Sequence, residues 1–253
     1  MQYIKSLIGK VHNVDCITTM KNIADNSVDL VITSPPYNKA GYEGFIRKRH
    51  GGDTWKARNI DYGDDPDNDF MPEDEYQNQQ INVLNELHRI LKPDGSIFYN
   101  HKIRIAQHKA SHPIEWILKT NFTFRQQIIW DRKSSPALAP IRYMPSTELI
   151  FWLTKTACQP NFERNKNALF VGEVWQFSAK PNPLHPAPFP PELPANIMMC
   201  IKDKTDNFLV YDPYAGSGTT LIEAKKFGYK YFGSEINLNY CNAANNSLNQ
   251  LLF

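Results

Sequence analysis

The chain has 253 residues, is 42% hydrophobic and carries a formal net charge of +2, which suits one large domain and excludes a polycation that binds nucleic acid through its overall charge. Its four cysteines are scattered without a Cys-x-x-Cys pair, which argues against a zinc ribbon or a disulfide framework and favours a reducing, cytoplasmic compartment. The sequence contains no signal-peptide core and no run of about 18 apolar residues, so we expect no membrane partner.

Residues 11–16 predict a short strand that ends near Asp15, and residues 17–23 predict a helix. A carboxylate at the end of a strand can accept a hydrogen bond from an adenine amine or a ribose hydroxyl. It equally often caps the helix that follows. Asp15 therefore has two interpretations at this point.

The β-branched run 28–32 predicts a buried parallel strand, and the sequence Thr33-Ser34-Pro35-Pro36-Tyr37, which we name the ledge, follows it directly. Open α/β sheets bind ligands at the carboxyl ends of their strands. Two consecutive prolines fix φ, remove two N–H donors and set the direction of the carbonyl oxygens. The ledge therefore suits a planar ring whose exocyclic amine donates hydrogen bonds, although a strand followed by a plain Pro-Pro turn is the simpler interpretation.

Residues 38–72 are rich in glycine and too long for an ordinary connection. Basic side chains alternate there with aromatic ones, which fits phosphate contacts combined with base stacking. A solvated insertion is the competing interpretation. The candidate DNA-contacting residues of this loop are Arg47, Lys48, Arg49, Trp55, Lys56 and Arg58.

An apolar stripe predicts a helix that ends near residue 91, where a Lys-Pro-Asp-Gly sequence stops it. Residues 96–100 predict the next strand, and residues 103–120 predict another helix. His108 and His112 lie four residues apart in that helix, but no third ligand supports a metal site, so we interpret them as a surface pair.

Two further strands are predicted at residues 122–130 and 147–153, with a polar loop between them that contains Arg132 and Lys133. The alternation of helices and strands up to this point indicates an α/β protein with a parallel sheet. Residues 155–195 break the alternation, and their prolines predict an extended surface segment that leads into a helix at about residues 192–201.

A strand at residues 208–211 precedes the sequence Asp-Pro-Tyr-Ala-Gly-Ser-Gly-Thr-Thr at 212–220, and a helix follows. A strand, a glycine turn and a helix allow the backbone to approach a nucleotide-like ligand closely. A P-loop would need lysine where Thr219 stands, and a dinucleotide fingerprint would need glycine where Leu221 stands. The turn therefore suits a cofactor without a pyrophosphate.

The strand predicted at residues 230–236 ends in Glu235, roughly 20 residues after the glycines, where an acid would accept both hydroxyls of a ribose. A glycine turn and a ribose-binding acid describe a nucleoside pocket. S-adenosylmethionine fits this pocket better than NAD, because nothing here holds two phosphates.

These motifs resemble those of the amino-methyltransferases that modify DNA bases, in which a [DNS]-P-P-[YF] ledge and a D-P-x-x-G-S-G-T-T turn recur. The ledge precedes the turn, an order that resembles the β class of restriction-modification enzymes. Further matching sequences lie at residues 92–96, 130–133, 148–150 and 185–190. The resemblance covers nearly the whole chain. It implies a single domain over residues 1–253 with a circularly permuted Rossmann-like fold, in which a mostly parallel, twisted sheet carries helices on both faces.

The resemblance also assigns roles by motif. Ser34, Pro35, Pro36 and Tyr37 would hold the target base, Glu235 the ribose and Asp15 the adenine amine. The expected cofactor-binding residues are Asp15, Cys16, Thr33, Phe189, Asp212, Tyr214, Ala215, Gly216, Ser217, Gly218, Thr219, Glu235 and Ile236. Residues 155–185 stand at the place of the target-recognition region. This span is small, so the loop at 38–72 is expected to share the task, with Arg132 and Lys133 as further DNA contacts.

The expected reaction moves a methyl group from S-adenosylmethionine, without a metal, to an exocyclic amine of a base flipped out of duplex DNA. Serine in the first ledge position resembles cytosine-N4 enzymes, and adenine-N6 methylation is the alternative. An RNA or protein-glutamine methyltransferase and a non-catalytic DNA-binding relative are the rival classes. A separately encoded restriction endonuclease is an expected partner, and a homodimer is common in the class.

Overall fold

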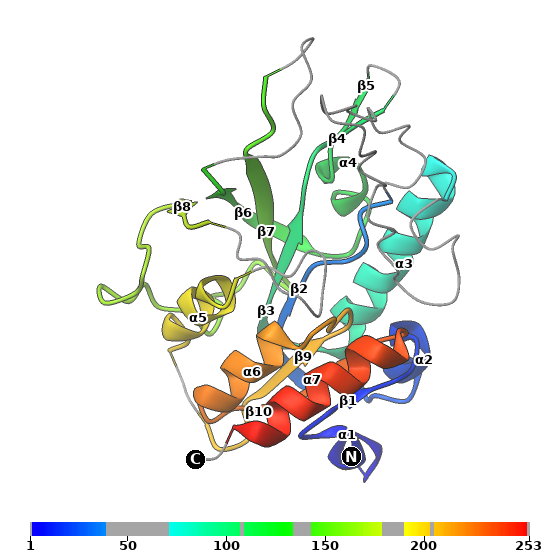
Figure 1. The fold of residues 1–253 in the computed structure, drawn as a ribbon, viewed down its shortest axis with the longest axis vertical. Helices are drawn as coiled ribbons and strands as arrows, with labels where there is room; N and C mark the ends of the chain where they lie inside the picture. The colour runs from blue at the N-terminus through cyan, green and yellow to red at the C-terminus, as the bar shows by residue number, and fades with distance from the viewer. Residues whose placement is uncertain are drawn as a thin grey trace, which may run out of the picture.

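The structure is a computed structural model that describes residues 2–38, 71–106, 109–133, 143–178, 190–202 and 205–251. An eight-stranded sheet forms its centre, in the order β1-β10-β9-β2-β3-β7-β6-β8 (Figure 1). These strands are β1 (Val11–His12), β2 (Val28–Thr33), β3 (Leu91–His101), β6 (Thr123–Asp131), β7 (Thr147–Thr154), β8 (Val174–Gln176), β9 (Leu209–Asp212) and β10 (Lys230–Ser234). A small hairpin of β4 (Arg104–Ala106) and β5 (Lys109–Ser111) stands apart from this sheet.

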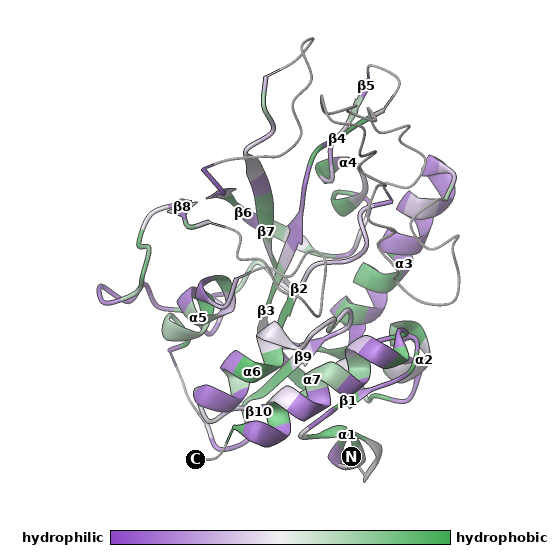
Figure 2. Ribbon diagram, in the orientation of Figure 1, coloured by the Kyte–Doolittle hydropathy of each residue, from purple (hydrophilic) through white to green (hydrophobic). Residues whose placement is uncertain are grey.

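Helices cover both faces of the sheet. The helices are α1 (Gln2–Leu7), α2 (Cys16–Lys21), α3 (Glu73–Ile90), α4 (Ile114–Ile117), α5 (Glu192–Met199), α6 (Thr219–Lys226) and α7 (Leu238–Gln250). One hydrophobic cluster joins the sheet to α5, α6 and α7, and the other joins it to α1, α2, α3 and α4. Figure 2 shows the alternation of hydrophobic and hydrophilic residues along α7, whose buried residues Cys241, Ala244 and Leu248 recur at helical spacing.

Strands β2 and β9 are neighbours at the middle of the sheet, and the strands that follow each of them in the chain are added on opposite sides. From β9 the sheet continues through β10 to β1, and from β2 it continues through β3 to β7. β2 pairs in parallel with β9, with Val31 opposite Tyr211. Ligands bind at such a switch point, outside the carboxyl ends of the strands. The ledge and the glycine turn follow these two strands and are therefore neighbours.

The sheet is mixed, although most neighbouring strands are parallel. Strand β7 runs antiparallel to both β3 and β6. A parallel connection needs a crossover, usually a helix, and the segment between β6 and β7 contains no described helix. The start of β7 therefore lies at the ligand-binding edge of the sheet, where the other strands end.

The helix predicted at residues 103–120 is wrong. The described residues of this span, 103–106 and 109–120, form the β4–β5 hairpin and one short helix, α4, which begins after Pro113. Proline lacks an N–H and disfavours helical geometry in the residue before it, so the sequence ahead of Pro113 stays extended. His108 lies outside the described residues.

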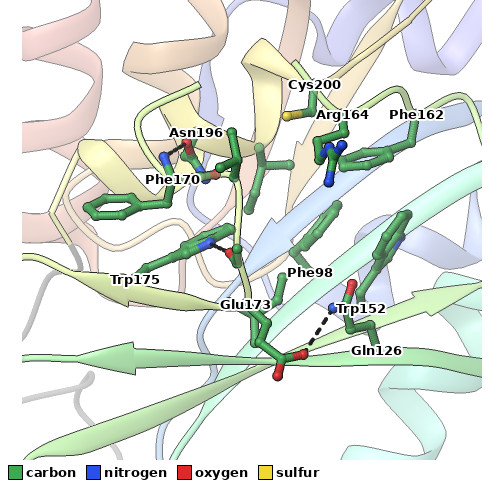
Figure 3. A pocket seen from close by; sticks show the side chains of 14 residues that line it. Phe98, Gln126, Trp152, Phe162, Arg164, Phe170, Glu173, Trp175, Asn196 and Cys200 are labelled. Carbon is green, nitrogen blue, oxygen red and sulfur yellow. Dashed lines mark hydrogen bonds between the residues drawn. The ribbon is translucent and has the colours of Figure 1, made fainter. Parts of the chain in front are cut away.

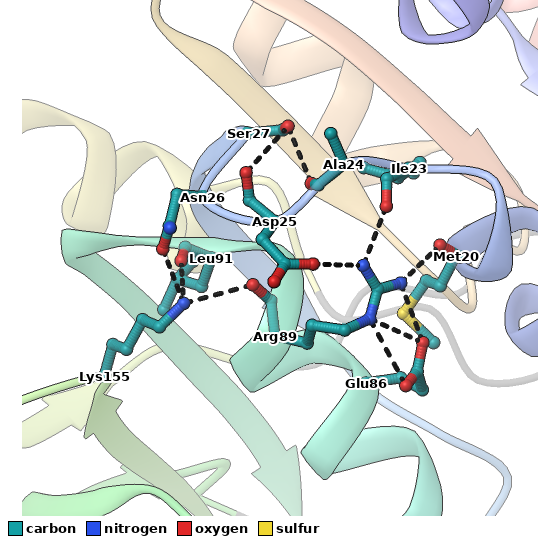
Figure 4. A network of polar contacts seen from close by, with 10 residues as sticks. All are labelled: Met20, Ile23, Ala24, Asp25, Asn26, Ser27, Glu86, Arg89, Leu91 and Lys155. Atoms are coloured by element: carbon teal, nitrogen blue, oxygen red, sulfur yellow. Dashed lines mark hydrogen bonds and ion pairs between the residues drawn. The ribbon is translucent and has the colours of Figure 1, made fainter. Parts of the chain in front are cut away.

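Arg89 and Lys155 fasten the segment that leads into β2 (Figure 4). The Arg89 guanidinium donates to the carbonyls of Met20 at 2.7 Å and Ile23 at 2.8 Å, at the end of α2. Lys155 Nζ donates to Asn26 Oδ1 at 2.6 Å and to the carbonyl of Leu91. These bonds fix where β2 begins, and β2 in turn positions the ledge.

Replacing Gly233 with alanine is expected to destabilise the fold by about 1–3 kcal/mol, because overpacking a core has this cost. A Cβ at residue 233 would lie 2.7 Å from Leu221 Cδ1 and 2.9 Å from Ala215 Cβ in the glycine turn. Urea unfolding measures the loss. Gly172→Ala is the control, since a Cβ there meets nothing within 4 Å; an equal loss in both variants would contradict this packing argument.

In the parts of the chain that the structure describes, no helix has the length and apolar character needed to cross a membrane.

Candidate active site

The ledge leaves the carboxyl end of β2 next to the glycine turn. Thr33 is fully buried and donates from Oγ1 to Asp212 Oδ1 at 2.8 Å. Pro35 is buried, whereas Ser34 is half-buried. The Pro36 carbonyl accepts a hydrogen bond of 2.8 Å from the Tyr76 hydroxyl. The two motifs that the sequence placed at opposite ends of the chain therefore share a direct side-chain bond.

Tyr37 lies at the centre of a polar cluster behind the ledge. Its hydroxyl is 2.8 Å from Ser34 Oγ and donates to Glu148 Oε2 at 3.0 Å. Asn100 Nδ2 donates to the same hydroxyl at 2.8 Å and to Glu148 Oε2 at 3.1 Å. Arg132 pairs with the other carboxylate oxygen, Glu148 Oε1, at 2.9 Å. These contacts hold Ser34 and Tyr37 in one geometry.

The Tyr37 ring is enclosed, with 7% of the residue exposed. His101 lies against it, with ring centroids 4.5 Å apart. The His101 Nε2 atom is 2.8 Å from the Tyr76 hydroxyl. One face of the Tyr37 ring is thus occupied by protein, and its hydroxyl faces the cluster rather than solvent.

The glycine turn connects β9 to α6. Gly216 and Gly218 adopt φ values of 51° and 85°, in the left-handed region that glycine enters without strain. Ala215 N donates to the Ser234 carbonyl at 2.9 Å, which holds the turn against β10. The turn has no lysine and forms a backbone cradle at the start of α6.

Asp212 is the buried carboxylate of this turn. Burial raises its pKa to about 6, although hydrogen bonds from the Thr33 and Thr220 side chains and the Tyr214 backbone oppose the shift. A carboxylate that is out of water but supplied with donors is poised to stabilise a neighbouring cation.

Glu235 follows β10 and links the turn to the start of α7 through its two carboxylate oxygens. Its Oε2 accepts from Gly216 N at 2.8 Å, and its Oε1 accepts from Asn237 N at 2.9 Å. Burial raises the pKa of this carboxyl. The adjacent Ile236 is 41% exposed. The Glu235 carboxylate and the apolar side chain of Ile236 therefore lie side by side, which suits the hydroxyls of a ribose and the flat ring of a nucleoside base.

Asp15 and Cys16 lie at the same edge of the sheet. Asp15 is the N-cap of α2 and accepts from Thr18 N at 3.0 Å, which is the capping interpretation that the sequence left open. Burial raises the pKa of the Cys16 thiol to about 12, so this thiol is not a thiolate nucleophile at neutral pH.

Several residues of the polar cluster were not among the site residues predicted from the sequence. Asn100 and His101 end β3, and Glu148 is the second residue of β7. The polar residues at the end of β3 could have been predicted as site residues from the sequence, because parallel strands bind ligands at their carboxyl ends. Glu148 was hidden because a parallel β7 would carry it to the opposite edge of the sheet.

The predicted DNA-contacting residues fall into three groups. Arg132 is turned into the site wall, with its side chain 16% exposed. Lys133 is exposed and has a φ of 65°. Arg47, Lys48, Arg49, Trp55, Lys56 and Arg58 lie outside the described residues, as does Phe189.

The segment at residues 162–175 packs on the sheet and encloses a cavity of about 480 Å³ (Figure 3). Aromatic side chains dominate the lining, which includes Phe98, Trp152, Phe162, Phe170 and Trp175. Asn196 of α5 fixes the segment by accepting from Phe170 N at 2.8 Å. No ledge residue lines this cavity. Part of the expected target-recognition region is therefore folded onto the domain.

A ledge and a glycine turn without a P-loop lysine lie together at the switch point of a mixed α/β sheet. This arrangement defines an S-adenosylmethionine-dependent methyltransferase fold. The sequence model of the DNA methylase family of N6 and N4 enzymes matches residues 28–246. The chain belongs to this family. The resemblance seen in the sequence and the predicted fold class are both confirmed.

Curated relatives agree with this assignment. The chain is 27% identical to the type II methyltransferase M.BglII of Bacillus subtilis, over 95% of this chain and 69% of the relative. It is also 27% identical to the DNA adenine methyltransferase YhdJ of Escherichia coli (strain K12), over 89% of this chain and 78% of the relative.

Solved structures share the fold. The cytosine-N4-specific PvuII DNA methyltransferase superposes with a TM-score of 0.69 at 21% identity, over 96% of this chain and 88% of that one. The M1.HpyAVI–SAM complex superposes with a TM-score of 0.65 at 18% identity, over 95% and 98%. At these identities the likeness shows the fold alone.

Proposed function

We propose that this chain transfers a methyl group from S-adenosylmethionine to the N4 amine of a cytosine flipped out of duplex DNA, as the modification enzyme of a restriction-modification system. The observation that carries the proposal is the bond between Thr33 of the ledge and Asp212 of the glycine turn. This bond joins a seat for an amine-bearing ring to a seat for a nucleoside cofactor.

The residues around the turn fit S-adenosylmethionine. Asp212 would face the cationic methionine end, and the backbone of residues 214–219 would enclose it. Glu235 and the exposed Ile236 would hold the ribose and pack against the adenine, with Asp15 and Cys16 beside them. The missing phosphate cradle also favours this cofactor over a dinucleotide. S-adenosylmethionine supplies the electrophilic methyl group, and the residues of the ledge act on the amine.

The ledge would activate a weak nucleophile. The lone pair of an exocyclic amine is delocalised into its ring. Hydrogen bonds from the amine to Ser34 Oγ and to a second acceptor would localise that lone pair and stabilise the charge that builds on nitrogen. The Pro36 carbonyl already accepts one hydrogen bond, from Tyr76, and we propose the Pro35 carbonyl as the second acceptor. Holding the amine in line with the methyl group supplies much of the remaining acceleration.

Cytosine is proposed as the base because Ser34 is a neutral hydroxyl, which resembles cytosine-N4 enzymes more than the aspartate usual for adenine. Adenine-N6 methylation is the second candidate, favoured by the similarity to an adenine methyltransferase. Tyr37 is proposed to contact the flipped base.

Duplex DNA is the proposed partner, with Lys133 as an exposed phosphate contact. Residues 38–72 and 155–185 are the proposed DNA-reading segments, and a separately encoded endonuclease and a second copy of the chain are the proposed protein partners. Salt dependence of DNA binding tests the phosphate contacts.

Incubation of the protein with labelled S-adenosylmethionine and unmethylated duplex DNA, followed by nucleoside analysis, tests the proposal. We expect label in N4-methylcytosine. Label in N6-methyladenine would move the assignment to the second candidate. DNA that stays unlabelled while RNA or a protein glutamine becomes labelled would overturn the proposed function.

A further inference from the structure

A continuous chain of polar groups leads from the ledge to a carboxylate behind it. Ser34 Oγ is 2.8 Å from the Tyr37 hydroxyl, and the Tyr37 hydroxyl is 3.0 Å from Glu148 Oε2. Tyr37 and Glu148 are each 7% exposed. Ser34 is half-buried and is the member of the chain closest to solvent. The chain therefore runs from the surface of the site into its wall.

The Glu148 carboxylate decides which group donates and which accepts in each hydrogen bond of this path. An ionised carboxylate only accepts hydrogen bonds, so the Tyr37 hydroxyl donates to Glu148. Its proton is then committed, and the Ser34 hydroxyl must donate to Tyr37. Ser34 Oγ has two lone pairs: one receives a long contact of 3.4 Å from Asn100 Nδ2, and the other can accept from an amine, which is what the proposed reaction requires.

Asn100 supports the same order of donors and acceptors. Its Nδ2 donates both to the Tyr37 hydroxyl and to Glu148 Oε2. Turning the amide round would set its oxygen against the carboxylate, so the observed orientation is the stable one. Arg132 balances the charge from the far side through Glu148 Oε1. Together these two residues hold both oxygens of Glu148 and keep its Oε2 aimed at Tyr37.

The proposed methyl transfer creates a proton that must leave. When the S–CH₃ bond breaks and the N–CH₃ bond forms, the sulfur keeps the electron pair and the amine nitrogen becomes positively charged with two hydrogens. One of these hydrogens has to be lost to give the neutral methylated base. The wall of the site contains one continuous path for it.

We propose that this proton passes to Ser34 Oγ as the Ser34 proton moves to Tyr37 and the Tyr37 proton moves to Glu148, so that the carboxylate becomes a carboxylic acid. The proposal rests on the proposed function and deepens it. Glu148 does not touch the substrate; it is a positioning residue that acts through Tyr37, and it returns its proton to solvent after the product leaves.

Glu148→Gln is the sharpest test. The glutamine keeps an acceptor for Arg132 but presents an NH₂ to Tyr37, which reverses the chain and makes Tyr37 donate to Ser34. We expect kcat for methyl transfer to fall about 100-fold, within the range of general acid–base effects, with KM for DNA and cofactor unchanged. Glu148→Asp, which keeps the charge, should recover part of the loss.

Tyr37→Phe removes one hydroxyl and interrupts the same path, so it should reduce kcat by a similar factor. Because the residues act as a unit, the double variant should be no slower than the slower single variant. Tyr99→Phe is the matched control: it loses a buried hydroxyl that bonds to Gln80 at 2.9 Å, outside the path, and should keep the wild-type kcat.

The outcomes separate the two proposals. Active wild-type protein with a Glu148→Gln variant within threefold of its kcat would overturn the relay alone. So would a double variant whose loss is the product of the single losses. Wild-type protein that methylates no DNA base would overturn the proposed function and the relay with it. If Glu148→Gln does not fold, the Tyr37→Phe and Tyr99→Phe pair decides the question.

Discussion

Replacing Ser34 with alanine is expected to slow methyl transfer about 100- to 1,000-fold while cofactor binding is retained. Removing one preorganised hydrogen-bonding group that acts on developing charge has an effect of this size. Ser34 is the half-buried member of the hydrogen-bonded path that it forms with Tyr37 and Glu148, and none of its hydrogen bonds in the described residues goes to Glu235, the carboxylate that binds the glycine turn. The rate of labelled methyl transfer in a single turnover and calorimetric cofactor binding are the two measurements.

Ser247→Ala is the control for the Ser34 variant. Its hydroxyl donates within α7 to the Ala243 carbonyl at 3.0 Å, as helical serines often do. This variant should leave both the rate and the cofactor affinity unchanged. A Ser34→Ala enzyme with a near-normal rate would contradict the role of the ledge hydroxyl, and one that fails to bind cofactor would show that Ser34 supports the fold of the pocket instead.

The chain order of the motifs was enough to predict the centre of the fold. Residues 28–32 are mostly apolar, with three β-branched side chains, and lead into Thr-Ser-Pro-Pro-Tyr, and residues 208–211 lead into the glycine turn. The two segments form the neighbouring parallel strands β2 and β9, because the structure that their local sequence favours is also the one that the fold requires. The Thr33–Asp212 bond follows from that adjacency.

Other features depend on relations that no local pattern contains. Glu148 lay in a matching motif near the start of a predicted strand but had no assigned role, and the antiparallel direction of β7 is what brings it behind Tyr37. Arg132 looked like a basic loop residue available to phosphate, but its guanidinium neutralises that same carboxylate. The charge partner of a buried group is set by strand direction, so it could not be predicted before the sheet was known.

Asp212→Asn is expected to stabilise the cofactor-free protein at neutral pH by about 1–3 kcal/mol, because the wild-type protein must bury an ionised carboxylate there. Burial raises the pKa of Asp212 from 3.8 to about 6, so the folded protein holds a proton that the unfolded chain releases. Folding is therefore favoured below about pH 4, and this contribution is lost as the pH rises to about 6. Asparagine keeps an oxygen for Thr33 and carries no charge to bury.

The measurement is urea unfolding of wild-type protein and of the Asp212→Asn variant between pH 4 and 8. Burial also raises the pKa of Asp29 and Glu235, but both proteins share those groups, so the difference between the two stability curves isolates Asp212. It should grow from pH 4 to 6 and stay constant above. Asp206→Asn, at an exposed turn, is the control for replacing a carboxylate with an amide. A flat difference for Asp212→Asn as well would contradict the raised pKa.

The same substitution should weaken cofactor binding, because the cationic methionine end of S-adenosylmethionine would lose a buried negative charge. A bound cation would also lower the pKa of Asp212, so wild-type affinity should rise as the pH increases through about 6, and the variant should lack this rise. Stability gained without cofactor and affinity lost with it would have one cause: a carboxylate whose burial is unfavourable to folding and is offset only when its ligand arrives.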